Sequence, residues 1–267
     1  PGLIPSKVTS KIFPKLSTLG PIAKTTKCLA YLLDAQVGNF FIKKNKNNLF
    51  SELIDNLPKK QIKIAWLGNF NGSYLYENEI KEICENFLKK LENHQFKIED
   101  LSPKFNSEII WESWIDLRSL SLKNDLYEIF KDKNKVTFLK QEIIWEIERA
   151  LTLSNADYKE ATYKRTKWKK YTDLLFNRFD FLALPSTQVF PFLAQVKYPS
   201  EINGKNLDTY HRWMEVVVPA SLLGLPTISI PCGFNTKGLP TGIQIIGKYG
   251  NDKEVLRTSN LIEKSKI

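Results

Sequence analysis

Two short apolar runs near the end of the chain constrain its fold more than any other feature. They cover residues 227–230 and 242–246, and the tripeptide Gly-Leu-Pro precedes each of them, at 224–226 and at 238–240. Proline supplies no backbone donor, so it stands at the first residue of a strand or at a sheet edge. Apolar runs bounded by glycine and proline are typical of buried strands. The pattern therefore predicts two buried strands joined by a turn.

A strand, helix and strand are predicted to follow one another in the first half of the chain. Residues 61–67 have the pattern of a strand, residues 77–91 that of an amphipathic helix, and residues 96–99 that of a second strand. This order is typical of a parallel sheet, whose crossovers are right-handed. We expect residues 40–150, which include this unit, to be rich in helix.

The remaining elements are predicted from apolar periodicity and from capping residues. Thr25 or Thr26 is expected to cap a first helix that ends at Gly38, and Ser154 to cap a long helix that ends near Phe179. A buried strand is expected to stop at Pro185. Other helices are expected at 109–120, 125–130, 138–153, 210–223 and 252–263, with loops at 1–24, 40–48 and 188–207.

Composition excludes several classes of protein. No run approaches the roughly 20 apolar residues of a membrane helix, and no signal peptide is visible, so a cytoplasmic protein without membrane contact is expected. The net charge of +10 comes from lysines scattered along the chain, which does not indicate a nucleic-acid partner. The three cysteines, Cys28, Cys84 and Cys232, are far apart and odd in number, so we expect buried thiols rather than disulfides or a metal site.

Three passages in the same order resemble the C-terminal end of the amidase signature family. They are Leu-Gly-Pro-Ile-Ala-Lys-Thr at 19–25, Phe-Asp-Phe-Leu-Ala-Leu-Pro-Ser-Thr at 179–187, and the two Gly-Leu-Pro strands at 224–247. The resemblance implies an α/β fold with a mixed β-sheet covered by helices. It also implies that residues 1–267 form the C-terminal part of such a domain, because the chain begins without methionine in the middle of a motif.

The same resemblance implies hydrolysis of a small carboxylic acid amide to acid and ammonia through a serine acyl-enzyme, without metal or organic cofactor. Two serines and a lysine catalyse this reaction in the family, and they belong to an upstream segment rich in glycine and serine. No such segment is present in this sequence. We therefore predict no catalytic residue in this chain and no amide hydrolysis by the chain alone.

Candidate substrate-binding residues come partly from position and partly from the resemblance. Ser186 and Thr187 follow the strand that ends at Pro185, and ligands gather beyond strand ends in such sheets, although a strand-terminating turn explains them as well. His211 begins a predicted helix and is more easily explained by structure than by catalysis. The proposed pocket residues are Arg165, Ser186, Thr187, His211, Trp213 and Met214.

Two alternatives remain open at this stage. One is the A subunit of a glutamyl-tRNA(Gln)/aspartyl-tRNA(Asn) amidotransferase. In that branch a substrate-binding arginine stands at the position of Arg165, which agrees, but an aspartate stands where this chain has Met214. That difference favours an amidase with a less polar substrate. The other alternative is a non-catalytic binding protein on the same scaffold. The tryptophan-rich segment at 111–145 is a candidate homodimer interface.

Overall fold

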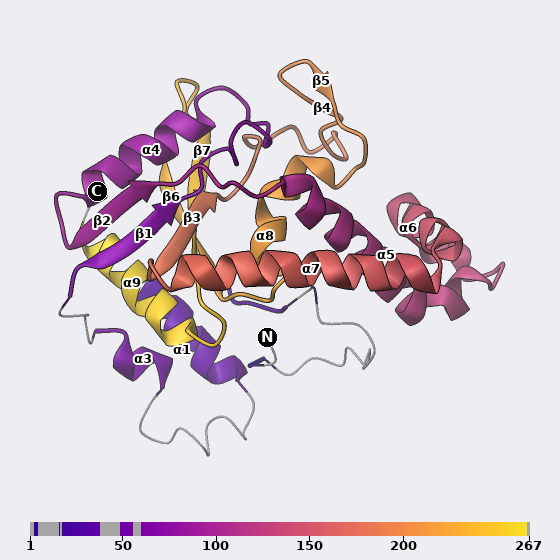
Figure 1. Ribbon diagram of the computed structural model, residues 1–267, viewed down its shortest axis with the longest axis horizontal. Helices are drawn as coiled ribbons and strands as arrows, with labels where there is room; N and C mark the ends of the chain where they lie inside the picture. The colour runs from indigo at the N-terminus through magenta and orange to yellow at the C-terminus, as the bar shows by residue number, and fades with distance from the viewer. Residues whose placement is uncertain (1–2, 5–15, 17, 38–48, 56–59, 266–267) are drawn as a thin grey trace.

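A five-stranded mixed sheet forms the centre of the structure, a computed structural model that describes residues 3–4, 16, 18–37, 49–55 and 60–265 (Figure 1). The strand order is β2-β1-β3-β7-β6. The strands β2, β1 and β3 are parallel, β7 is antiparallel to β3, and β6 is antiparallel to β7. The expected mixed sheet of an α/β fold is thus confirmed. The strands are β1 Ile62–Trp66, β2 Phe96–Asp100, β3 Phe181–Pro185, β6 Thr227–Phe234 and β7 Pro240–Gly247.

Helices cover both faces of this sheet because side chains alternate between the two faces of every strand. Leu182 and Ile246 face a cluster with helices α5, α7 and α8, whereas Ala183 and Ile245 face a cluster with α4 and α9. The predicted strand–helix–strand unit is present as β1, α4 and β2. The helices are α4 Ile80–Leu91, α5 Ser107–Phe130, α7 Asn155–Phe176, α8 Val218–Ser221 and α9 Asp252–Lys264.

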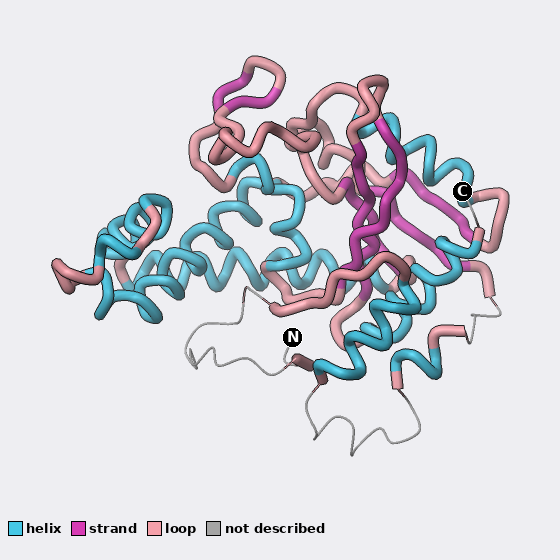
Figure 2. Tube along the Cα trace, turned by 180° about the vertical axis from the view of Figure 1, so that it is seen from behind, coloured by secondary structure: helices cyan, strands magenta, loops and turns pink. Residues whose placement is uncertain are grey.

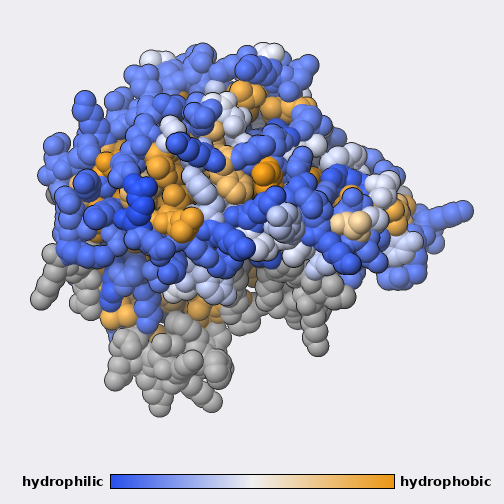
Figure 3. Space-filling model, in the orientation of Figure 1, coloured by the Kyte–Doolittle hydropathy of each residue, from blue (hydrophilic) through white to orange (hydrophobic). Residues whose placement is uncertain are grey.

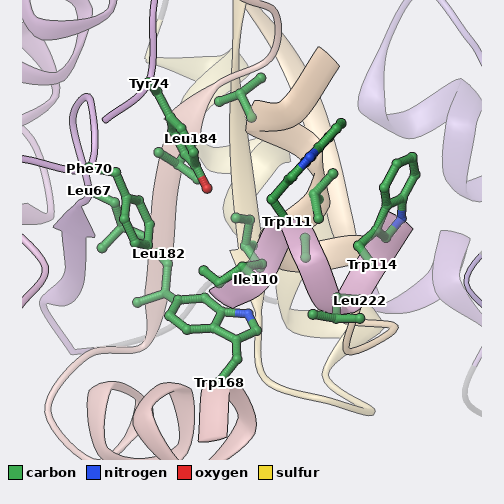
Figure 4. Packing of buried hydrophobic residues seen from close by; sticks show 14 of the residues in the cluster. Leu67, Phe70, Tyr74, Ile110, Trp111, Trp114, Trp168, Leu182, Leu184 and Leu222 are labelled. Carbon is green, nitrogen blue, oxygen red and sulfur yellow. The ribbon is translucent and has the colours of Figure 1, made fainter. Parts of the chain in front are cut away.

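The larger core cluster is built around Trp168 of α7, whose side chain is fully buried. Figure 4 shows this indole beside Leu182 of the sheet and Ile110 of α5. Its ring nitrogen donates a hydrogen bond of 2.9 Å to the carbonyl oxygen of Pro219 in α8. A buried indole N–H needs such a partner. Trp168 therefore joins three helices to one face of the sheet.

A third, smaller cluster packs α1 (Thr26–Gln36) and α3 (Phe50–Leu53) against α9. Thr25 caps α1 as predicted, since its hydroxyl accepts a hydrogen bond of 3.1 Å from the N–H of Cys28. Leu33 of α1 is buried, whereas its neighbour Leu32 is 38% exposed. The predicted loop at 40–48 and the helix end at Gly38 lie outside the described residues.

The helical part of the chain extends away from the sheet as an arm formed by α5, α6 (Gln141–Thr152) and one end of α7 (Figures 1 and 2). The two helices expected at 109–120 and 125–130 are one continuous helix of 24 residues, α5. Ser154 begins α7 with the predicted capping box: its hydroxyl bonds the N–H of Asp157, and the carboxylate of Asp157 bonds the N–H of Ser154. Trp111 and Trp114 are buried in the core, whereas Trp145 is 39% exposed.

Two sequence-based expectations about the end of the chain were wrong in detail. β6 is an edge strand with many exposed residues, not a buried one, and it continues through Pro231, which an edge tolerates because no neighbour needs its N–H. The helix expected at 210–223 is a 3₁₀ helix, η2 (Arg212–Val217), followed by the short α8. Pro219 explains this break, because a proline ring clashes with the carbonyl group four residues earlier in a continuous α-helix.

The loop expected at 188–207 contains a short hairpin of β4 (Glu201–Ile202) and β5 (Lys205–Asn206), with Asn203 and Gly204 at the turn. Asn-Gly is a favoured hairpin turn, and this signal was missed. The expectation of buried thiols holds for Cys84 but not for Cys28, which is exposed. Within the described ranges, no helix combines the length and the apolar character that a membrane crossing requires.

Candidate functional site

An open cavity of about 990 Å³ lies beyond the ends of β3, β6 and β7. Its walls also include residues 3–4 and 18–23, the start of the loop after β3, the segment η2–α8, and side chains of α1 and α9. The antiparallel pairing of β3 with β7 and of β7 with β6 brings residues from three distant parts of the sequence to this place. The cavity is the natural candidate for a ligand site, since it has the size of known small-molecule pockets.

Two serine hydroxyl groups meet in this cavity. The Oγ atoms of Ser186, at the end of β3, and Ser229, in β6, lie 2.7 Å apart, and either can be the donor. The N–H of Ser186 donates to the carbonyl oxygen of Gly242 at 2.8 Å, which fixes the backbone beside β7. Because one hydroxyl hydrogen is used within the pair, the other remains free to donate to a ligand.

Two buried glutamines fix the backbone around the cavity. The side-chain nitrogen of Gln244 donates to the carbonyl oxygens of Pro185 and Val216, at 2.9 and 3.0 Å. The side-chain oxygen of Gln188 accepts the N–H of Val216 at 3.0 Å. The main-chain N–H and the main-chain carbonyl oxygen of Val216 are therefore both hydrogen-bonded to glutamine side chains. This holds η2, which carries Trp213, against the sheet.

Two polar atoms at the cavity wall are buried without a hydrogen-bond partner among the described residues. They are the hydroxyl oxygen of Thr241, whose residue is 5% exposed, and the indole nitrogen of Trp213. Buried polar groups are nearly always paired in native proteins. Because neither atom is exposed to the cavity, neither can contact a ligand there unless its side chain moves.

Apolar side chains form most of the remaining wall. Phe190, Phe192 and Trp213 lie on one side, with the rings of Phe192 and Trp213 in edge contact at 5.6 Å between centroids. Leu19 and Ile22 belong to the N-terminal part of the wall and are 64% and 93% exposed. The cavity therefore suits a ligand that is mainly apolar with a small polar end. The face of the molecule drawn in Figure 3 is mostly hydrophilic, with apolar residues gathered in a few places.

No general base is hydrogen-bonded to the serine pair among the described residues. The hydrogen bond that each of these two hydroxyl groups makes goes to the other; the described part of the cavity wall contains no histidine or lysine, and its one carboxylate, Asp252, is not hydrogen-bonded to either serine. In the described part of the chain, no three His, Cys, Asp or Glu side chains are grouped so that they could hold a metal ion. The described residues can thus bind and orient a ligand, but a serine nucleophile needs a base that they do not supply.

The structure brings together three of the six predicted pocket residues. Ser186, Thr187 and Trp213 line the cavity, whereas Met214 stands at the kink of η2 outside it. Arg165, in the middle of α7, donates from Nε to the carbonyl oxygen of Leu222 at 2.7 Å, and burial lowers the pKa of its guanidinium. The Arg165 side chain therefore binds the backbone at the C-terminal end of α8 and does not line the cavity.

His211 also lies away from the cavity, in a buried polar cluster between η2 and the helical arm. Its Nε2 atom is 2.9 Å from a carboxylate oxygen of Glu146, and the other carboxylate oxygen is 2.9 Å from Nε of Arg118. Both His211 and Glu146 are buried almost completely. The rings of Trp114 and Tyr210 pack against the imidazole. The arrangement joins α5, α6 and η2 through one carboxylate.

A second buried carboxylate lies beside the cavity-forming segment. Glu215 of η2 accepts a hydrogen bond of 3.0 Å from Arg212, whose guanidinium also bonds Glu108 and stacks on the ring of Trp111. Burial raises the pKa of Glu215 to about 7, although Arg212 opposes the shift. This carboxyl group therefore changes charge near neutral pH.

Several residues of the cavity were missed by the sequence-based reasoning. Ser229 stands between Ile228 and Ile230 in β6, so the sequence could have predicted that it lies on the opposite face of the strand from them. Its partner Ser186 is 43 positions away, and no local pattern connects the two serines. Gln244 and Thr241 belong to the second Gly-Leu-Pro passage. A polar side chain in a predicted buried strand was the signal that could have marked them as candidates. Phe190 and Phe192 belong to the segment that was expected to be a loop.

Comparison with known proteins places this geometry in context. The family model described as Amidase matches residues 2–256. The chain is 26% identical over 269 residues to an acylamidase of Rhodococcus erythropolis, which covers 97% of this chain and 54% of the relative. It is 40% identical over 112 residues to the A subunit of the glutamyl-tRNA(Gln) amidotransferase of Prochlorococcus marinus (strain AS9601), covering 41% of this chain and 22% of that protein.

Solved structures agree with the fold. A bacterial aryl acylamidase of the amidase signature enzymes superposes with a TM-score of 0.75 at 21% identity, over 92% of this chain and 52% of that chain. The chain thus spans about half the length of that structure and of the acylamidase.

Proposed function

This chain belongs to the amidase family, and we propose that its protein cleaves the carbon–nitrogen bond of an amide whose acyl group is mainly apolar. The observation that carries the proposal is the cavity at the ends of β3, β6 and β7, where aromatic and aliphatic walls surround the hydroxyl pair of Ser186 and Ser229. The similarity to an acylamidase along nearly the whole chain supports the reaction class.

In this proposal the described residues hold the substrate, and they do so in two ways. The rings of Phe190, Phe192 and Trp213 take the apolar group out of water, which stabilises binding by about 0.8 kcal/mol per buried CH₂. The free hydroxyl hydrogen of the Ser186–Ser229 pair donates to the amide carbonyl oxygen. The glutamine contacts keep both groups in place before the substrate binds.

We assign the nucleophile and its base to residues outside this sequence, as the family resemblance implies. Neither cavity serine is hydrogen-bonded to a base among the residues described, which supports this assignment. The isolated chain would then bind an amide without hydrolysing it. Hydrolysis would require the catalytic serines and lysine of the family.

A series of 4-nitroanilides with straight acyl chains of increasing length tests both parts. We expect the dissociation constant for the 267-residue chain to fall about three- to fourfold per added CH₂ until the cavity is filled. Ser186→Ala should weaken binding of every member about fivefold and leave the dependence on length unchanged. Ser200→Ala, at an exposed position outside the cavity, is the matched control and should bind as the native chain does.

Each part of the proposal can fail separately. Affinity that does not depend on acyl length, or that is equal for Ser186→Ala and the control, contradicts the substrate site. Release of 4-nitroaniline by the isolated chain contradicts the assignment of the nucleophile. Hydrolysis should occur in a longer natural protein that contains these residues, and its failure there with all amides would favour a non-catalytic binding protein.

The amidotransferase alternative has similarity to several A subunits in its favour, including the 40% identity over 112 residues to that of Prochlorococcus marinus. Two features of the site weigh against it. Arg165 is bonded to the carbonyl oxygen of Leu222 and does not line the cavity, and Met214 provides no carboxylate for a glutamine amino group. Ammonia release from free glutamine, measured in the longer protein with its tRNA-bound acceptor, would favour this alternative over an apolar amide.

A further inference from the structure

Two cysteines meet on the face of the sheet opposite the larger core cluster. Cys84 of α4 and Cys232 of β6 are separated by 148 positions, yet their Sγ atoms are 3.7 Å apart. Cys84 is fully buried, and Cys232 is partly exposed. Neither residue belongs to the wall of the cavity described above. The pair is therefore a second chemical feature, reachable from solvent on the side of Cys232.

The local backbone places Cys232 in this position. The pairing of β6 with β7 skips one residue, since Pro231 pairs with Gly242 and Gly233 pairs with Thr241. Cys232 is thus the extra residue of a β-bulge and has no partner in the ladder, and such bulges redirect side chains. An edge strand with a bulge also leaves this side chain freer to move than one in a central strand.

Helix α4 packs closely on the bulge. A Cβ atom on Gly233 would lie 2.8 Å from Cγ2 of Ile83, so only glycine allows this approach. Ahead of the helix, the carboxylate of Glu79 accepts hydrogen bonds from the N–H and the hydroxyl of Thr236, at 2.9 and 3.0 Å. Contacts on both sides thus keep the two sulfur atoms together in the folded protein.

The surroundings favour oxidation of the pair over metal binding. Among the described residues, no third His, Cys, Asp or Glu joins the two thiols to form a metal site. The hydrogen bond from the Cys84 thiol lowers the pKa of Cys232, whereas the same interaction and burial raise the pKa of Cys84. Cys232 is therefore the more nucleophilic and the more accessible sulfur, because the thiolate is the reactive form.

We propose that Cys84 and Cys232 form an oxidation site, in which hydrogen peroxide converts the two thiols into an intramolecular disulfide. The Cys232 thiolate attacks one peroxide oxygen and breaks the O–O bond, which gives a sulfenic acid and releases hydroxide. Cys84 then attacks the sulfur of Cys232, the S–S bond forms, and the hydroxyl group leaves as water. Two thiols and one peroxide give one disulfide and two waters, so two electrons pass from sulfur to oxygen.

The required movement is small. A disulfide has an S–S length of about 2.05 Å, so the sulfurs must approach by roughly 1.7 Å from their present separation, which side-chain rotation at the bulge can supply. The bond would tie α4 to the edge strand β6. Ser229 lies on the same strand, so oxidation would also fix one wall of the cavity.

Counting free thiols after oxidation tests the proposal. The folded 267-residue chain is treated with a few equivalents of hydrogen peroxide, then denatured and labelled with N-ethylmaleimide, and its intact mass is measured. We expect the number of labels to fall from three to one, with the remaining label on Cys28. Dithiothreitol should restore three labels, and peptide mapping should find the Cys84–Cys232 cross-link.

Two variants separate the pair from a general sensitivity to oxidant. Cys28→Ser, at the exposed cysteine, should still lose two labels, whereas Cys232→Ser should lose none reversibly and give no intramolecular cross-link. Three labels on the native protein after oxidation would overturn the proposal. So would cross-links that involve Cys28 alone, or irreversible acids on Cys232 without disulfide. The native-protein measurement decides the matter even if a variant does not fold.

Discussion

The side-chain nitrogen of Gln244, in β7, donates a hydrogen bond of 3.0 Å to the main-chain carbonyl oxygen of Val216, in η2. Because the same nitrogen also donates to the carbonyl oxygen of Pro185, one amide group in the middle of β7 joins the end of β3 to η2. The joined segments are the ones that carry Ser186 and Trp213. The shape of the candidate site thus depends on a residue that does not itself need to contact a ligand.

Gln244→Leu is expected to lower the free energy of unfolding by about 2–4 kcal/mol. Leucine has a similar volume but leaves two buried carbonyl oxygens without their donor, and each such loss costs about 1–3 kcal/mol. Chemical denaturation with urea measures the change. Gln195→Leu, at an exposed loop position, is the control and should stay within about 0.5 kcal/mol of the native protein. Equal effects of the two variants would contradict the role assigned to Gln244.

Glu146→Gln tests the buried cluster between the helical arm and η2. The change removes the negative charge that faces Arg118 and His211, and breaking a buried ion pair by changing one partner costs roughly 3–5 kcal/mol. We expect a loss of about 3 kcal/mol in thermal or chemical denaturation. Glu148→Gln makes the same replacement two positions away on an exposed part of α6 and should have little effect. A Glu146→Gln protein as stable as the Glu148→Gln protein would show that the cluster adds no stability.

The cluster also illustrates what sequence alone could and could not predict. His211 was proposed as a pocket residue at the start of a predicted helix, with a structural role as the alternative, and the structure places it in this cluster instead. Its partner Glu146 is 65 positions away and looked like any charged residue of an amphipathic helix. Local rules succeeded where the information is local: Thr25 and Ser154 were recognised as helix caps, and the Gly-Leu-Pro passages as paired strands. Partners separated by many residues depend on packing that no local pattern encodes.

The candidate site was also predicted only where the information is local. Ser186 and Thr187 were predicted because strand ends collect ligands, and both line the cavity. Arg165 was proposed from the family resemblance alone, and resemblance does not fix where a long side chain points. Cys84 and Cys232 were expected to be unrelated, because the bulge at Cys232 arises from strand pairing and cannot be read from a short run of residues.

Stability should depend on pH through Glu215. Its pKa is about 7 in the folded protein and has an ordinary value of 4.5, so the folded state binds more protons than the unfolded state between these values. The stabilisation is complete below about pH 4.5 and is lost as pH rises through 7, with a total of at most about 3 kcal/mol. The difference in unfolding free energy between native protein and Glu215→Gln should change in this direction across the interval.

Glutamine at position 215 keeps an acceptor for Arg212 but cannot ionise, which makes it the suitable comparison. Urea denaturation at pH 5, 6, 7 and 8 gives the two curves. Glu92→Gln, on the exposed end of α4, should follow the native pH profile. Parallel curves for native and Glu215→Gln proteins would contradict the assignment of the titration to this carboxyl group.

The contact between β7 and α9 gives the sharpest test of packing. A Cβ atom on Gly247 would lie 2.5 Å from Cγ2 of Val255, so Gly247→Ala must push the helix from the sheet or move the valine. Overpacking of this kind costs about 1–3 kcal/mol.

Val255→Ala, which removes the obstructing methyl groups from a buried site, should itself cost about 2 kcal/mol. The two changes are complementary in volume, so the double variant should be more stable than the sum of the single effects predicts, by about 1 kcal/mol or more. Gly20→Ala, where an added Cβ meets no atom within 4 Å, controls for the substitution itself. Strict additivity of the two changes in urea denaturation would mean that α9 does not pack on β7 at this position.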